Sequence, residues 1–145
     1  MSRSETELSP GYLVKRVQQS LRRRCDGALR PTGLSMAQYA AMRALDDMPE
    51  ASASDLARRC FVTRQSLQDL LAGLRSAGLV ADAPSAPRGR ARALELTPAG
   101  RQRLADGDAA VDDVDTAMVA DLTPTQRRQL AAMLVRCAEN LEAEG

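Results

Sequence analysis

The chain has 145 residues, of which 44% are hydrophobic and only 2% aromatic, and its formal net charge is +1. A chain of this length can bury a core without disulfides or metal ions, and its apolar content together with scattered charges excludes a disordered protein. Since Leu, Ala, Val and Met must supply that core, the composition favours helices over a β-sandwich.

Several classes of protein are disfavoured by what the chain lacks. No apolar run approaches the roughly 20 residues that cross a bilayer, and the opening MSRSETELSPG has acids where a signal peptide would be apolar. We therefore expect a cytoplasmic protein with no membrane partner. The chain has no histidine, and Cys25, Cys60 and Cys137 fit neither a disulfide framework nor a zinc site. Without the commonest general base, we expect neither an enzyme nor a bound cofactor or metal.

The near-neutral total charge conceals an uneven distribution along the chain. Residues 54–103 hold nine arginines and four acids, whereas residues 104–145 hold three arginines and nine acids. A basic middle followed by an acidic end is the pattern expected when one segment faces a polyanion and another does not.

Helix signals divide the first half of the chain. Ser9-Pro10 predicts a helix that runs to about residue 29, and Ser35 caps a second helix over residues 36–48. A capping box at residues 52–55 then opens a short helix.

The following helix has a strongly amphipathic pattern. Thr63 caps it and Gly78 closes it. Its apolar residues recur at spacings of three and four: Leu67, Leu70, Leu71 and Leu74. The opposite face carries Gln65, Asp69, Ala72 and Ser76, with Gln68 beside them.

The periodicity then changes to that of a β-hairpin. Residues 79–81 form a short apolar strand, DAPSAPRGR is a loop, and the alternating ARALEL is the return strand. Thr97-Pro98 opens a long acidic helix to about Asp121, which we expect to be weakened at Gly107. A last helix follows Thr123-Pro124, with an apolar stripe of Leu130, Met133, Leu134, Cys137 and Leu141.

A short helix, a tight turn, a capped helix and a hairpin are the parts of a winged helix-turn-helix, here within a mainly α chain. The polar face of the capped helix fits the major groove of DNA, where Gln65 and Gln68 can bond to base edges. Arg64 and Arg75 flank that face, near phosphates. The hairpin loop carries three arginines suited to a minor groove: Arg88, Arg90 and Arg92. A solvated amphipathic helix and a loop that only aids solubility are the alternative interpretations.

Three blocks of the sequence resemble the multiple-antibiotic-resistance regulator (MarR) family. LSMAQYAAMRAL resembles the second helix of the family, and SDLARRCFVTRQSLQDLLAGLRSAGLV resembles its helix-turn-helix. GRARALELTPAGR resembles the second strand of the wing and the start of the helix that follows it. The order of the three blocks and the spacing between them also match the family. LT-x-x-G alone is a weak signal, but the three blocks in register are a strong one.

The resemblance implies a single domain over residues 1–145 that forms a homodimer on a pseudo-palindromic DNA site. Residues 9–30 and 98–145 would supply the dimerisation helices and residues 35–97 the DNA-binding part. Such regulators are usually repressors, and many respond to small phenolic ligands. By position Arg90 matches the wing-tip arginine. The polar face of the capped helix, the hairpin loop and the resemblance together give the expected DNA contacts: Thr63, Arg64, Gln65, Ser66, Gln68, Asp69, Arg75, Arg88, Arg90 and Arg92.

Two positions depart from the pattern of the family. The family often has an acid two residues before the wing-tip arginine, and this chain has Arg88 at that position. The acid–arginine ion pair that would orient the tip of the wing is therefore missing or replaced by another pair. Asp69 stands where many members have a basic or neutral residue. It can accept a hydrogen bond from cytosine or pair with Arg64 or Arg75, and the sequence leaves these possibilities open.

The effector is less defined by the sequence. The family binds small aromatic effectors between the dimer helices and the DNA-binding part, which points to Tyr12, Arg16, Tyr39, Met42 and Arg43. One alternative is an oxidant-sensing regulator that uses Cys25, whose thiol pKa three preceding arginines would lower. Another is a winged helix that binds proteins and has no DNA site of its own.

Overall fold

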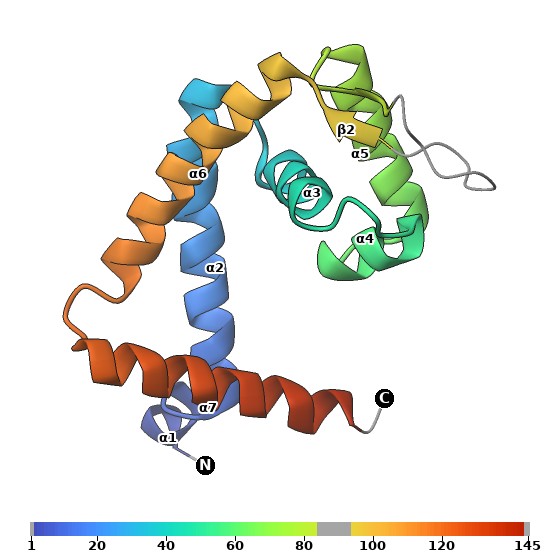
Figure 1. Cartoon of the computed structure of the whole chain (residues 1–145). Coiled ribbons are helices and arrows are strands. Elements are labelled where there is room, and N and C mark those ends of the chain that lie inside the picture. The colour runs from blue at the N-terminus through green and yellow to red at the C-terminus, as the bar shows by residue number, and fades with distance from the viewer. Residues whose placement is uncertain (1, 84–93, 144–145) are drawn as a thin grey trace. The chain divides into compact units, whose positions relative to one another are not determined.

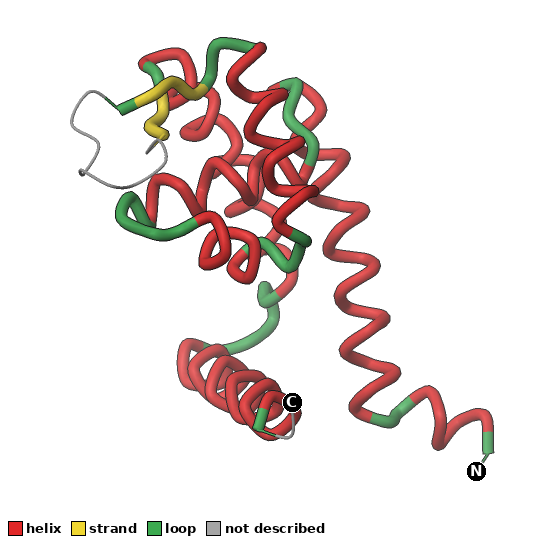
Figure 2. The backbone as a smooth tube through the Cα atoms, turned by 90° about the vertical axis from the view of Figure 1, so that its right-hand side faces the viewer, coloured by secondary structure: helices red, strands yellow, loops and turns green. Residues whose placement is uncertain are grey.

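The computed structural model describes residues 2–83 and 94–143 as a set of helices with one small two-stranded sheet (Figure 1, Figure 2). Its contacts divide the chain into two units, Met1–Val114 and Asp115–Gly145, and each unit is described by itself. No helix in the described ranges is both long and apolar enough to cross a membrane.

The elements follow the predicted order. They are α1 (Arg3–Glu7), α2 (Pro10–Leu29), the 3-10 helix η1 (Arg30–Thr32), α3 (Met36–Asp47), α4 (Ala53–Arg59), α5 (Arg64–Ser76), β1 (Val80–Asp82), β2 (Leu94–Leu96), α6 (Pro98–Met118) and α7 (Pro124–Glu142). The strands are antiparallel, with Val80 opposite Leu96. The expected fold class, mainly helical with a small hairpin, is confirmed.

Side-chain caps explain most of the helix starts. Ser35, Ser52 and Thr123 each accept a hydrogen bond from the backbone three residues later, and Gln38, Asp55 and Gln126 bond back to them as complete capping boxes. Each such cap stabilises its helix by about 1 kcal/mol. Ser9 precedes α2 as predicted but does not cap it, because its hydroxyl donates to the Thr6 carbonyl at 2.8 Å. The short helix α1, capped by Ser2, was not predicted.

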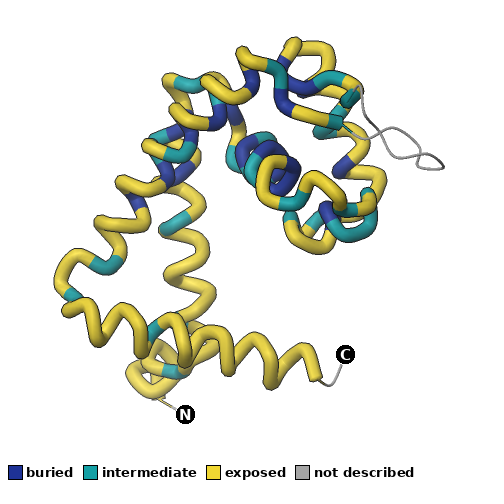
Figure 3. The backbone as a smooth tube through the Cα atoms, viewed as in Figure 1, coloured by how far each residue is buried: buried dark blue, intermediate teal, exposed yellow. Residues whose placement is uncertain are grey.

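The core of the first unit lies where α3, α4, α5 and the hairpin meet the end of α2 and the inner face of α6, which is buried from Gly100 to Val114. The buried residues in Figure 3 gather there, whereas the first half of α2 is exposed. The largest fully buried side chains are Leu29, Met42, Leu67, Leu74 and Cys25. Burying a leucine of this kind stabilises the fold by about 1.5–3 kcal/mol.

The LT-x-x-G motif joins the hairpin to α6 through close backbone packing. The Thr97 hydroxyl donates to the Gly78 carbonyl at 2.7 Å and accepts from the Gly100 N–H at 3.0 Å. A Cβ on Gly100 would lie 2.0 Å from the backbone oxygen of Leu79. The motif therefore needs a hydroxyl to cap the helix and a residue without a side chain one turn later.

Gly107 does not weaken α6, which runs unbroken past it to Met118 and so ends before the predicted Asp121. A Cβ on Gly107 would lie 2.7 Å from the Tyr39 ring, so this glycine allows α6 to approach α3. The next residue, Asp108, accepts hydrogen bonds from the Tyr39 hydroxyl and from Arg43, both at 2.7 Å. Burial first, and then Asp108, raise the pKa of Tyr39 well above its usual value.

The second unit contains α7, and none of the side chains of this helix is buried. Its predicted apolar stripe is largely exposed: Met133 is 60% and Leu141 is 80% exposed, whereas Leu130 is half-buried. A 19-residue helix with an exposed apolar stripe is expected to pack against another apolar surface.

Candidate nucleic-acid interface

Helix α4, a tight turn and helix α5 form a helix-turn-helix, and both helices pack on α3. Leu67 and Leu74 of α5 are buried in the core, whereas Leu70 and Leu71 are half-buried against it. This apolar attachment fixes the rotation of α5, so its opposite side is presented away from the core.

The predicted polar face of α5 is exposed. The exposed side chains are Gln65, Gln68, Asp69, Ala72 and Ser76. A side chain must reach beyond its helix to bond to a base edge, and exposed amides on one helix face meet that requirement.

Thr63 and Ser66 have a structural role in the start of α5. The Thr63 hydroxyl accepts from the Ser66 N–H and donates to the Ser66 hydroxyl, each at 3.0 Å. Both residues remain exposed. Their hydroxyls hold the first turn of the helix in shape, so any contact with a phosphate there would add to that capping role.

Among the described residues, Asp69 pairs with neither Arg64 nor Arg75, the two partners that the sequence leaves open. Its carboxylate instead accepts a hydrogen bond from the Gln65 amide, with 3.1 Å between Nε2 and Oδ1. Arg75 pairs with Asp82 of β1 at 2.9 Å, and this hydrogen bond raises the Arg75 pKa. Asp69 thus orients an amide on the exposed face, while Arg75 ties α5 to the hairpin.

The remaining expected contacts are all arginines. Arg64 is exposed at the start of α5, where a phosphate could approach it. The wing arginines Arg88, Arg90 and Arg92 lie outside the described residues, so their place in the wing stays a prediction.

The five residues expected to line an effector site are in different environments. Met42 is fully buried and Tyr39 is 7% exposed, so both contribute to the core. Arg43 pairs with Asp108 and also with Asp46 and Asp47. Tyr12 and Arg16 are exposed on α2.

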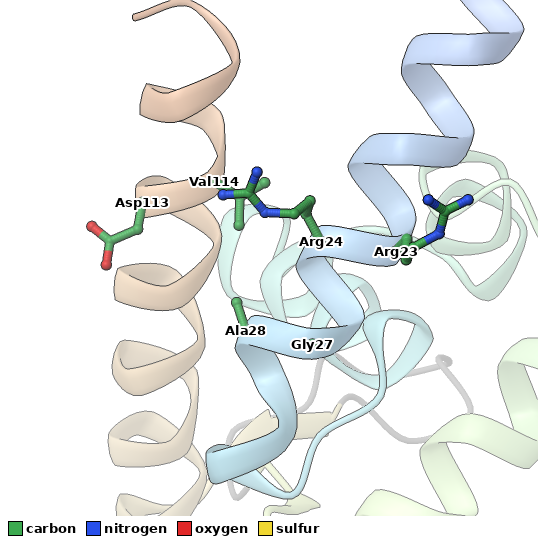
Figure 4. Close-up of a pocket in the computed structure, with 6 residues that line it drawn as sticks. All are labelled: Arg23, Arg24, Gly27, Ala28, Asp113 and Val114. Atoms are coloured by element: carbon green, nitrogen blue, oxygen red, sulfur yellow. The ribbon is translucent and has the colours of Figure 1, made fainter.

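A hollow of about 390 Å³ lies elsewhere in the first unit, between α2 and α6. Its walls combine two cations and one acid with small apolar groups: Arg23, Arg24, Gly27, Ala28, Asp113 and Val114. In Figure 4 the Arg24 guanidinium lies beside Val114, whereas the Asp113 carboxylate points away from it. Sequence patterns did not reveal this hollow, because it depends on how two distant helices pack.

The three cysteines lie in different environments. Cys25 is 1% exposed and belongs to the core, which disagrees with the accessible, cation-flanked thiol that oxidant sensing would use. Cys60 is half-buried, and its burial raises the thiol pKa. Cys137 is exposed on α7.

Sequence reasoning missed two paired carboxylates and one residue with an unusual backbone conformation. Asp82 and Asp108 pair with residues on other elements, and no spacing in the sequence indicates such partners. Phe61, in the turn between α4 and α5, has a left-handed backbone with a φ of 57°. Its place two residues before the Thr63 cap could have indicated a helix-ending position, where glycine is usual.

Comparison with known proteins agrees with this architecture. A model of the MarR family matches residues 32–91. The HTH-type transcriptional repressor Rv2887 of Mycobacterium tuberculosis is 36% identical over 124 residues, which cover 86% of this chain and 89% of the repressor.

Two crystal structures of M. tuberculosis Rv2887 have a similar fold. The structure of its complex with DNA has a TM-score of 0.71 and 32% identity, and the match covers 89% of this chain and 97% of that chain. The structure of its complex with salicylic acid has a TM-score of 0.72 and 35% identity, and the match covers 89% of this chain and 96% of that chain. The chain therefore belongs to the MarR family of winged helix-turn-helix transcription regulators.

Proposed function

We propose that this chain is a transcriptional repressor that binds duplex DNA as a homodimer and reads base sequence with α5. The observation that carries the proposal is the exposed polar face of α5, opposite its buried leucines. The 36% identity to a repressor, and the DNA complex of that relative, support the same role. In this proposal the protein binds DNA rather than catalysing a reaction, and it acts in the cytoplasm, where bacterial DNA lies.

The dimer would place two α5 helices about one helical turn of DNA apart, roughly 34 Å, on a pseudo-palindromic site. Residues 9–30 and 98–145 would form its interface, in keeping with the exposed apolar stripe of α7. Residues 35–97 would bind the DNA. Together they would make the 145 residues one MarR-like domain.

The direct test selects a duplex from fragments of the source genome with the full-length chain and measures Kd against salt. Gln65→Ala and Gln68→Ala should each weaken binding to the selected duplex by about 1–3 kcal/mol and relax its base preference. Arg90→Ala should weaken binding to all duplexes alike. Gln102→Ala on α6, an exposed amide outside the helix-turn-helix, is the control.

Two results would contradict the DNA proposal. One is an unchanged base preference in both glutamine variants. The other is an affinity that hardly depends on salt, because each phosphate contact should contribute about 0.9 units of log K per unit of log salt. The second result would favour a winged helix that binds proteins.

We further propose that a small aromatic carboxylate releases the DNA, and that it binds in the hollow between α2 and α6. The guanidinium of Arg24 beside the apolar Val114 suits a carboxylate on an aromatic ring (Figure 4). The salicylic acid complex of Rv2887 supports this class of ligand.

Salicylate is the probe for the effector proposal. Titrated into the protein–DNA complex, it should release the duplex, and Arg24→Ala should raise the concentration for half-release by about tenfold. Arg22→Ala removes an exposed arginine of the same helix outside the hollow and is the matched control. If Arg16→Ala or Arg43→Ala raises that concentration and Arg24→Ala does not, the effector site is the one expected from the sequence.

A further inference from the structure

Helices α4 and α5 end with the same hydrogen-bonding motif. After α4, the N–H of Phe61 donates to the Arg58 carbonyl at 3.2 Å and that of Val62 to Ala57 at 3.0 Å. After α5, the corresponding bonds run from Gly78 to Arg75 at 3.0 Å and from Leu79 to Leu74 at 2.9 Å. Both are Schellman motifs, whose central residue must adopt a left-handed backbone.

The two motifs differ in the residue at that left-handed position. Gly78 has a φ of 77° after α5, and Phe61 has a φ of 57° after α4. Glycine adopts this conformation without strain, whereas the Cβ of any other residue is crowded by the backbone. Phenylalanine therefore destabilises the turn relative to glycine, which the same chain uses for the same purpose 17 residues later.

Among the described residues, no packing of the Phe61 side chain compensates for this strain. The Phe61 side chain is 95% exposed, the highest value among the exposed large hydrophobic residues of the described chain. Its two neighbours in the turn, Cys60 and Val62, pack against the core instead. A fully exposed aromatic ring on a strained backbone is thus unfavourable in the isolated protein, and such outliers gather at functional sites.

The surroundings of Phe61 indicate the kind of partner. Arg58, Arg59 and Arg64 lie within three residues of it along the chain and are exposed, and of these Arg58 also pairs with Asp55 and Arg59 with Asp47. Phe61 also precedes by two residues the Thr63 cap of α5. An apolar ring among cations fits a partner that combines phosphates with apolar surfaces, as the sugar and base edges of DNA do.

We propose that Phe61 is a DNA-contact residue that buries its ring against the edge of the groove entered by α5. The contact is apolar, to a deoxyribose or to a thymine methyl group. This inference rests on the proposed DNA binding and adds to it a residue that contributes affinity without neutralising any phosphate.

The experiment compares Phe61→Gly, Phe61→Ala and Phe61→Tyr on the duplex selected by the full-length wild type. The first two should weaken binding about tenfold through the lost apolar contact, while tyrosine should keep the affinity within about twofold. The slope of log K against log salt should not change in any of them. Arg64→Ala is the matched contrast, because losing a phosphate contact lowers that slope by about one.

Thermal unfolding without DNA separates this role from a structural one. Phe61→Gly should have a Tm no lower than wild type, because it removes the strain, and Phe61→Ala should melt below Phe61→Gly, because it retains a Cβ. Uracil in place of thymine in the duplex distinguishes the two apolar contacts, since only a base-methyl contact is weakened.

Three outcomes would overturn the inference. If Phe61→Gly and Phe61→Ala bind the selected duplex as tightly as wild type, Phe61 does not contact DNA, although the proposed function stands. If they weaken dimerisation instead, Phe61 is a self-association contact. If wild type enriches no duplex at all, the proposed function fails and this inference fails with it.

Discussion

At the level of single residues, the packing of α6 depends on the absence of a side chain at Gly100. Gly100 is buried against the Leu79 carbonyl, so α6 is in backbone contact there with the residue that directly precedes β1. A neighbouring backbone atom cannot move aside as the end of a flexible side chain can. The join between the hairpin and α6 therefore depends on this glycine.

Gly100→Ala should lower the free energy of unfolding by about 1–3 kcal/mol because of overpacking against backbone. Gly73→Ala is the matched control, since Gly73 is also within a helix but has nothing within 4 Å of an added Cβ. That change should raise the free energy of unfolding by about 0.5–1 kcal/mol through helix propensity. Urea unfolding of the two variants measures both effects, and equal stability would contradict the packing argument.

At the element scale, Asp108 joins α3 to α6 by accepting from Tyr39 and Arg43. Asp108→Ala should lower the free energy of unfolding by about 1–2 kcal/mol, because two partly buried donors lose their acceptor. Asp108→Asn should lower it less, since its amide oxygen can still accept. Asp106→Ala, which removes an exposed carboxylate bonded only locally to Gln102, is the control and should change it by less than about 0.5 kcal/mol.

A second link between elements, Asp47, should make stability depend on acid pH. Desolvation acts to raise the Asp47 pKa, but hydrogen bonds and charge from Arg43 and Arg59 outweigh it and hold the pKa below its usual 3.8. A folded-state pKa below the unfolded one contributes stability at neutral pH, and that contribution is lost as pH falls through the folded pKa.

The pH dependence can be measured by urea unfolding of wild type and Asp47→Asn from neutral to acid pH. Wild type should be the more stable at neutral pH, and the difference between the two should shrink as Asp47 becomes protonated. A constant difference across the range would show that the lowered pKa does not contribute to stability.

At the scale of the whole molecule, the exposed apolar stripe of α7 predicts self-association. Leu134→Glu puts a charge on that stripe and should convert the dimer to monomer and weaken DNA binding. Ala132→Glu adds the same charge to the opposite side of α7 and should leave the dimer intact. Sedimentation of both variants tests this, and a dimer that tolerates Leu134→Glu would place the interface elsewhere.

Much of the fold and part of the candidate site could be predicted from the sequence because the relevant signals are local. Helix starts follow from caps such as Ser52 and Thr63, and the exposed face of α5 follows from its leucine spacing. The family could be recognised for the same reason, since its three motifs are short contiguous segments. These features depend on residues within a few turns of each other.

Only the tertiary structure determined which residues from distant elements meet. The approach of α6 to α3 at Gly107, the pairing of Arg75 with Asp82 and the burial of Cys25 all depend on the packing of elements. Such contacts leave no periodic signal in a single sequence, because each partner looks like an ordinary residue of its own helix or strand. Local signals were therefore enough to predict the family and the elements other than α1 and η1. Three-dimensional packing decided which polar groups are engaged and which remain exposed for a partner.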